Sequence, residues 1–162
     1  MSASYHMRRQ DREITDRDEI HGLLDAGRYA TLALVDEGRP YAVTLSYGFD
    51  PESMSLYFHV AHEGRKLDII GREPRACASV VIDHGYTQGE CEHPFESVVM
   101  DGTMRTVSDA EEKLLAIRTL VEHLETDSEG YWNSRAWQLS DRLDGFTALV
   151  FKIESLTAKR SK

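Results

Sequence analysis

Cysteine is scarce in this sequence of 162 residues, which contains only Cys77 and Cys91. Two cysteines are too few for a disulfide framework, so we expect free thiols and a reducing compartment. No apolar stretch approaches the roughly 20 residues that a membrane span needs, and the first residues contain no apolar signal core. These absences favour a cytoplasmic protein without a membrane partner.

Positive charge is also scarce. The sequence has 19 Lys and Arg against 28 Asp and Glu, which gives a formal net charge of −9. Binding along a nucleic-acid backbone requires a concentrated basic surface, so we expect no nucleic-acid partner. The negative net charge does not exclude a single phosphate group held in a local pocket.

Internal repeats, low-complexity tracts and linker-like runs of Pro, Gly or Ser are absent too, and the length suits one domain. We expect an N-terminal arm over residues 1–14 and a single domain over residues 15–160. Thr15 reads as a helix N-cap with Asp18 at the third helical position, and it opens a short helix that Gly27 closes.

Six runs rich in β-branched and aromatic residues follow, separated by turn residues at hairpin intervals. The predicted strands are Tyr29–Val35, Tyr41–Phe49, Ser55–Val60, Arg75–Asp83, Glu96–Val107 and Phe146–Ser155. Gly102 inside the fifth run indicates a bulge or a close backbone approach. Because barrel closure removes exposed sheet edges, the pattern predicts a mainly β (α+β) fold, a small antiparallel barrel with peripheral helices.

Three further segments have helical patterns. Glu63–Ile70 is a short helix, and Tyr131–Leu139 forms another turn or two. Between them, Ser108 and Glu111 form a capping box that leads an amphipathic helix ending around Glu125. The apolar stripe of that helix consists of Leu114, Leu115, Ile117, Leu120, Val121 and Leu124.

Motifs for hydrolysis and nucleotide binding are missing: Gly-x-Ser-x-Gly, Gly-x-Gly-x-x-Gly and Gly-x-x-x-x-Gly-Lys-Ser/Thr do not occur. The only close pairs of metal-binding residue types are His59 with His62 and Cys91 with His93. Two separate fragments of two ligands do not resemble a zinc ribbon, so we predict no metal site.

Arg65 and Lys66 stand where a strand ends and a short helix begins. Amides at a helix N-terminus favour an anion, and the adjacent Arg and Lys add a planar fork and a point charge. This segment can hold a phosphate monoester. The alternative is that both side chains belong to the solvated face of a surface helix.

Five short motifs then occur in a characteristic order, namely Tyr41–Tyr47, Ser55–His59, Glu63–Asp68, Arg72–Ala76 and Ser97–Gly102. Their order and spacing resemble the pyridoxamine-5′-phosphate-oxidase-like superfamily of FMN-binding split barrels. The resemblance covers about residues 8–157, and it is nearest to the branch that includes the nitroimidazole-resistance reductases. It implies a six-stranded antiparallel split β-barrel with peripheral helices, which binds FMN at the interface of a homodimer.

The resemblance also implies a role for each motif. Arg65 and Lys66 match the basic pair that holds the flavin phosphate. The strand along the isoalloxazine ring is matched by Val43, Thr44, Leu45 and Ser46. The strand flanking the ribityl chain is matched by Phe58, His59 and Val60. A strand that approaches the flavin from the partner subunit is matched by Glu96, Ser97 and Val98.

Two departures from the oxidases proper argue against pyridoxamine-phosphate oxidase activity. Gly64 stands where those enzymes have a Ser before the basic pair, and their C-terminal Arg/His motif is not visible in Phe146–Lys162. His59 is either a catalytic proton or hydrogen-bond donor beside the flavin, or a half-buried strand residue. Tyr47 either lines the substrate side or packs in the barrel. Trp132 and Trp137 either cover the pocket mouth or pack between helices.

The sequence thus predicts an FMN-dependent oxidoreductase that transfers electrons from a nicotinamide reductant to a small organic acceptor. The alternative is a carrier or sensor that holds a flavin (FMN or FAD), a deazaflavin or haem without turnover of its own. A haem ligand stays open because several histidines are available, namely His59, His62, His84 and His93. A third hypothesis is an interaction domain without a cofactor.

Overall fold

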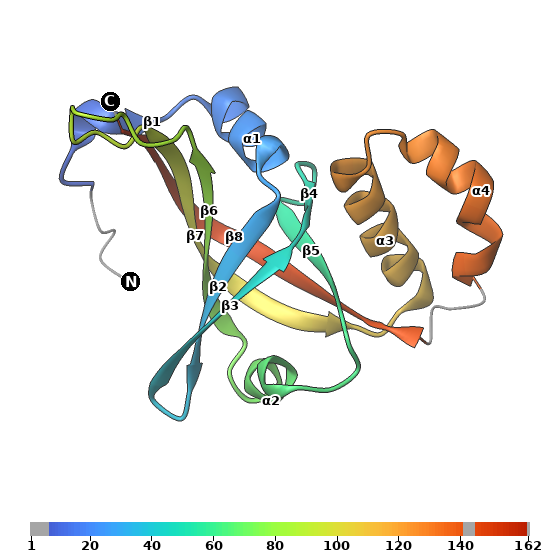
Figure 1. The fold of residues 1–162 in the computed structure, drawn as a ribbon. Helices are drawn as coiled ribbons and strands as arrows, with labels where there is room; N and C mark the ends of the chain where they lie inside the picture. Colours follow the sequence, from blue (N-terminus) through green and yellow to red (C-terminus); the bar gives the residue numbers. More distant parts are fainter. Residues whose placement is uncertain (1–6, 141–144, 162) are drawn as a thin grey trace.

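A single antiparallel sheet forms the body of the protein, and the helices lie around it (Figure 1). The computed structural model describes residues 7–140 and 145–161, without the side chains of residues 135–140. The strands are β1 (Glu13–Ile14), β2 (Tyr29–Asp36), β3 (Arg39–Ser46), β4 (Gly48–Asp50), β5 (Ser55–Val60), β6 (Arg75–Asp83), β7 (Phe95–Val107) and β8 (Thr147–Arg160). Their order is β3-β2-β6-β7-β8-β5-β4, and β1 pairs with β8.

The two ends of this order, β3 and β4, are consecutive in the chain and are separated only by Tyr47. One segment therefore supplies both edges of the sheet, and the sheet curls into a barrel that is split between them. The predicted strand Tyr41–Phe49 divides because its alternation fails: Tyr47, Gly48 and Phe49 are all buried in succession. The mainly β split barrel is confirmed, with eight strand segments among the described residues rather than six.

Tyr47 packs in the barrel, which resolves the alternative left open by its sequence. Its side chain is fully buried, and its hydroxyl donates a hydrogen bond of 2.5 Å to the carbonyl of Leu24. Burial raises the pKa of this phenol well above its usual value. Tyr47 therefore fastens the link between the two sheet edges to the end of the first helix.

The strand β8 is the common partner of three others, since it pairs with β1, β5 and β7. It runs five residues beyond the predicted end at Ser155, because its later residues alternate between the core and solvent. The last two residues of the expected arm, Glu13 and Ile14, form β1 against it, and Ile14 is buried. At Gly102 the register of β7 with β8 shifts, as predicted, and a Cβ there would overlap the carbonyl oxygen of Lys152.

The helices are η1 (Gln10–Arg12), α1 (Arg17–Ala26), α2 (Arg65–Arg72), α3 (Ala110–Leu124) and α4 (Ser128–Ser140). The caps of α1 and α3 fall one residue later than predicted, at Asp16 and Asp109. In both helices the carboxylate of this aspartate accepts the backbone N–H three residues on. A carboxylate at this position also interacts favourably with the positive end of the helix dipole.

The helix α3 packs over β4 and β5 and closes a second core cluster beside the barrel interior. Ile117, Leu120 and Val121 are buried there, whereas Leu114 and Leu115 of the predicted stripe are exposed. At Gly48 the strand backbone comes so close to α3 that a Cβ would lie 2.6 Å from the backbone nitrogen of Leu120. No helix in the described ranges is both long and apolar enough to cross a bilayer.

His123 fixes the C-terminal end of the same helix. Its side chain is 2% exposed. Its Nε2 lies 2.7 Å from the carbonyl oxygen of Gly27, and its Nδ1 accepts the N–H of Phe49 at 3.4 Å. These contacts attach α3 to both α1 and β4. The helix is therefore a rigid wall of the space between α3 and β5.

Candidate functional site

The N-terminus of α2 follows β5 closely and lies at the bottom of the sheet in Figure 1. Gly64 precedes it with a φ of 136°, a backbone conformation that favours glycine. The N–H groups of Leu67 and Asp68 donate to the Gly64 carbonyl. Those of Arg65 and Lys66 have no acceptor within the described residues. Two free amides and two cationic side chains therefore occur at one helix end, as an anion site requires.

Arg65 is held in place by Asp36 and by the ring of Tyr41. Its Nε lies 3.0 Å from Oδ2 of Asp36, and the other oxygen of Asp36 accepts from Arg72 at 2.7 Å. Its guanidinium lies over the ring of Tyr41, 4.7 Å from the centroid. The hydrogen bond from Arg65 lowers the pKa of Asp36, so this carboxylate stays ionised.

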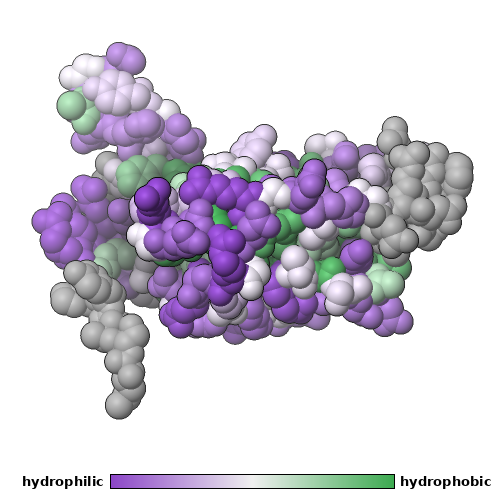
Figure 2. All heavy atoms as spheres, turned by 90° about the horizontal axis from the view of Figure 1, so that it is seen from below, coloured by the Kyte–Doolittle hydropathy of each residue, from purple (hydrophilic) through white to green (hydrophobic). Residues whose placement is uncertain are grey.

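Lys66 is half-buried and has no ion pair among the described residues. The face that contains α2 and the β2–β3 hairpin is strongly hydrophilic at its middle, with hydrophobic residues showing between the polar ones (Figure 2). A fixed guanidinium and an unpaired ammonium at this surface can bind a phosphate monoester while leaving the remaining part of a ligand to follow the neighbouring strands.

Alternation along β3 and β5 decides which predicted residues can touch a ligand with their side chains. Thr44 and Ser46 are exposed on the outer face, as is His59. The remaining predicted strand residues point into the barrel and offer a ligand only their backbone: Val43, Leu45, Phe58 and Val60. The structure therefore separates the seven residues into three that present polar side chains and four that position them.

His59 faces Phe146 across the end of the sheet. The two rings meet edge to face with centroids 4.8 Å apart. Partial burial lowers the pKa of His59, so the imidazole is neutral at pH 7 and can donate from one nitrogen and accept at the other. No hydrogen bond ties His59 to another side chain in the part of the chain that the structure describes.

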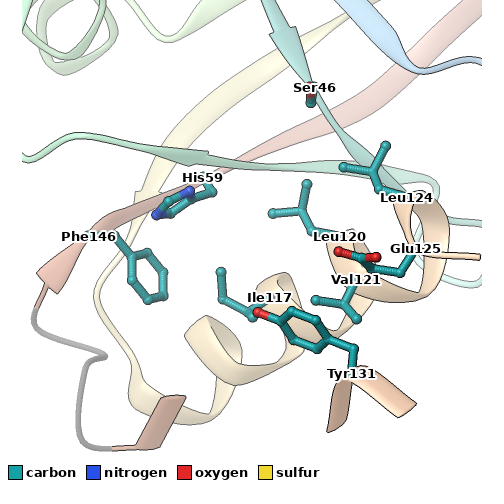
Figure 3. A pocket seen from close by; sticks show the side chains of 9 residues that line it. All are labelled: Ser46, His59, Ile117, Leu120, Val121, Leu124, Glu125, Tyr131 and Phe146. Carbon is teal, nitrogen blue, oxygen red and sulfur yellow. The ribbon is translucent and has the colours of Figure 1, made fainter. Parts of the chain in front are cut away.

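A cavity of about 490 Å³ opens beside His59, between β5 and the helix α3 (Figure 3). It is lined by Ser46, His59, Ile117, Leu120, Val121, Leu124, Glu125, Tyr131 and Phe146. Apolar side chains of α3 form one wall, and the ring of Tyr131 and the carboxylate of Glu125 lie at its side in Figure 3. A mostly apolar pocket with a few converging polar groups is the usual form of a small-molecule site.

Sequence reasoning missed the part of this cavity that comes from the helices. Ile117, Leu120 and Val121 were assigned to an apolar stripe, which explains their burial but not the space beside them. Glu125 and Tyr131 lie more than sixty residues after His59 in the chain. The sequence offered one indication of these residues, the acidic segment between the two predicted helices. The position of that segment cannot be deduced from the sequence, because it is set only when α3 packs on β4.

Glu96, Ser97 and Val98 lie at the start of β7, at the opposite end of the sheet from α2 (Figure 1). Glu96 is hydrogen-bonded to Nε2 of His84 at 2.7 Å, and Val98 is fully buried in the barrel core. Within one chain these residues are not brought together with Arg65. Their predicted contact with a flavin therefore requires a second copy and stays a prediction.

The remaining candidates are placed as follows. Trp132 packs against the second core cluster and does not line the cavity, and the side chain of Trp137 lies outside the described residues. His62 contacts the hydroxyl of Thr147, and His93 contacts Asp83. In the described ranges, no group of three or more metal-binding side chains is arranged to hold a metal ion.

This fold agrees with comparisons to known proteins. The sequence profile of the family described as pyridoxamine 5′-phosphate oxidase matches residues 16–160. The chain therefore belongs to the pyridoxamine 5′-phosphate oxidase family. Among curated proteins the comparison found no match.

Three solved structures share this fold. A protein of Bacteroides thetaiotaomicron described in terms of 5-nitroimidazole antibiotic resistance is 21% identical with a TM-score of 0.75, covering 91% of this chain and 86% of that one. An FAD-binding protein of Mesorhizobium loti is 22% identical with a TM-score of 0.64, covering 93% and 96%. The FAD and haem binding protein of Mycobacterium smegmatis is 22% identical with a TM-score of 0.70, covering 93% and 74%. At these identities the likeness establishes the fold.

Proposed function

We propose that the protein binds FMN as a homodimer and uses it to pass electrons from a nicotinamide reductant to a small organic acceptor. The observations that carry this proposal are the free amides at Arg65 and Lys66, which follow His59 closely in the chain, and the cavity beside α3 that His59 lines. The free amides suit a phosphate, and the cavity suits a planar apolar ring system.

The residues fit the cofactor in a definite way. Arg65 and Lys66 would hold the phosphate, with the guanidinium of Arg65 oriented by Asp36 and Tyr41. The outer face of β3 would lie along the ring, where Thr44 and Ser46 offer hydroxyl groups. Bound flavin supplies the hydride and electron chemistry. The chain supplies orientation, an apolar wall that excludes water, and a neutral imidazole at His59 able to donate a hydrogen bond.

A dimer is supported by the outer face of the sheet. One row across five strands consists of Thr44, Thr31, Ser79, Val99 and Thr157, and none of these residues is charged. Beside the row, Tyr29 is 63% exposed and Val81 is 54% exposed. A sheet face of small uncharged residues and exposed apolar side chains suits burial against a second copy. Ser97 pairs with Val81 on the same face, but it is buried within one chain.

A charge placed in this row is expected to break the dimer. Val99→Lys puts like charges close together across a two-fold axis, which we expect to weaken association by about 100-fold or more. Light scattering after size-exclusion chromatography measures the mass, and equilibrium dialysis measures FMN uptake. Leu115→Lys is the matched control, because Leu115 is similarly exposed but lies on α3. A Val99→Lys protein that keeps both its dimeric mass and its FMN would refute the proposed interface.

The residues of the chain also bear on the identity of the acceptor and on the cellular compartment. The acceptor is not expected to be pyridoxamine phosphate, because Gly64 replaces the hydroxyl residue of the oxidases and no second basic pair lines the described part of the cavity. With two free thiols, the protein suits a reducing cytoplasm.

The deciding experiment is the visible absorption spectrum of protein purified without added cofactor, together with the mass of any released chromophore. We expect a yellow protein with the two visible bands of an oxidised flavin, and the mass of FMN. FAD in its place would correct the cofactor but keep the class. A colourless protein that takes up no flavin on titration would refute the proposal.

A second candidate function is haem binding without turnover. It is favoured by His59, whose imidazole is neutral and not engaged by another side chain of the described residues, as a haem ligand must be. One of the similar structures is named as an FAD and haem binding protein. The same spectrum separates the two candidates, because haem gives an intense Soret band that is absent from flavin.

A further inference from the structure

The cavity beside α3 carries an uneven distribution of charge. Glu125 is its only ionised side chain among the described residues that line it, because His59 is held neutral by partial burial. No Lys or Arg is among those lining residues. A cavity of this composition stabilises a positive charge and repels a negative one.

The position of Glu125 strengthens this effect. It is the C-cap of α3, where the dipole of the helix is negative. Arg28 lies at this helix end, and its Nη1 donates to the carbonyls of His123 and Leu124, at 3.1 Å each. The contacts of Arg28 are thus to the backbone, and none joins it to Glu125 within the described residues.

The approach to the cavity is acidic as well. The connection from α3 to α4 contains Glu125 and Asp127, the first turn of α4 adds Glu129, and no basic residue occurs in this stretch. Asp127 accepts the N–H of Gly130 at 2.8 Å, so its carboxylate is fixed at the start of α4. An acidic rim raises the local concentration of cations and slows the approach of anions.

Aromatic rings complete the arrangement. Tyr131 and Phe146 both line the cavity; in Figure 3 Tyr131 lies near the carboxylate of Glu125, whereas Phe146 lies on the other side, beside His59. The face of an aromatic ring attracts a cation, and its surface accommodates a planar apolar ligand. The apolar wall of α3 contributes contact area without any competing hydrogen-bond donor.

From these observations we infer that Glu125 determines specificity in this cavity, selecting an aromatic acceptor with a positive charge over an anionic one. This deepens the proposed function, since it rests on the cavity being the acceptor end of the flavin site. Acceptors that carry a phosphate or carboxylate beside the ring are disfavoured by the same carboxylate.

The test uses three bicyclic probes of similar size and different charge: N-methylquinolinium, quinoline and naphthoate. Their dissociation constants are measured by titration calorimetry on the purified dimer, both with its flavin and after the flavin has been removed. We expect N-methylquinolinium to bind about tenfold more tightly than naphthoate. Glu125→Gln should remove most of that preference, and Glu125→Lys should reverse it.

Glu122→Lys is the matched control, because Glu122 is exposed on the same helix and does not line the cavity. It should leave the order of the three probes unchanged. Equal affinity for the cation and the anion, an unchanged preference in Glu125→Lys, or no binding of any probe would each overturn the inference. A protein that retains flavin but shows no charge preference refutes this inference alone. A protein that prefers the cation through Glu125 but takes up no flavin refutes the proposed function instead.

Discussion

FMN binding is expected to fall by more than about 100-fold when Arg65 and Lys66 are both replaced by alanine. A charge-assisted hydrogen bond contributes about 1.5–3 kcal/mol, and the double variant removes two such groups from the free N-terminus of α2. Fluorescence quenching of free flavin by the apoprotein measures the affinity. Only the backbone amides would remain for the phosphate, so residual binding should be weak and insensitive to salt.

Riboflavin is the natural control for this experiment, because it lacks the phosphate. Its affinity should be nearly the same for the native protein and for the double variant. A second control removes two exposed arginines elsewhere, Arg17 and Arg118, and should leave FMN binding unchanged. If the double variant at residues 65 and 66 loses riboflavin as completely as FMN, the phosphate role of this pair is wrong.

Gly48→Ala is expected to destabilise the protein by about 3 kcal/mol, because the added methyl group meets backbone atoms that have no side-chain freedom to move. The Cβ would lie 2.6 Å from the nitrogen of Leu120 and from the carbonyl carbon of Thr119. For a protein of this length the melting temperature should fall by about 10 °C. Thermal unfolding followed by circular dichroism gives the value.

The matched control is Gly22→Ala in the exposed part of α1, where an added Cβ meets no atom within 4 Å. Alanine is the better helix former there, so this variant should be more stable by about 0.5–1 kcal/mol. Equal melting temperatures for the two variants would contradict the close approach of β4 to α3. Because Leu120 also lines the cavity, Gly48→Ala should in addition weaken binding of the aromatic probes.

The sequence predicted the strands well where alternation or turn residues are local properties. It placed Gly102 at an irregularity because a glycine inside a strand has no side chain to pack and is typical of a bulge. The sequence did not predict that the strand breaks at Tyr47, where the chain passes from one edge of the sheet to the other. That crossing depends on the barrel as a whole, and nothing near Tyr47 in the sequence specifies it.

Both helix caps illustrate a smaller kind of error. Thr15 and Ser108 are good N-cap residues, but each is followed by an aspartate that is equally suitable. The choice depends on where the first helical N–H groups point, and that is set by the packing of α1 and α3. The predicted end of α3 at Glu125 is confirmed, since its helix ends at Leu124.

The position of Arg65 and Lys66 at a helix start was predictable from the sequence, and the cavity was not. Arg65 and Lys66 are adjacent to one another and to the helix start, so their arrangement is a local property. The pairing of Arg65 with Asp36 joins residues 29 positions apart. The cavity forms where β5 meets helices that come much later in the chain. Hydrophobic periodicity identifies the apolar face of those helices, but it does not show which strand they pack against.

The pairing of β8 has a consequence for synthesis on the ribosome. This strand follows β1, β5 and β7 in the chain, yet all three pair with it. None of these pairings can form until β8 has left the exit tunnel, so β5 waits with an unpaired edge while more than eighty further residues are added. The nascent chain therefore has unpaired strand edges until its last strand is synthesised, and such edges are the sites at which incomplete sheets aggregate.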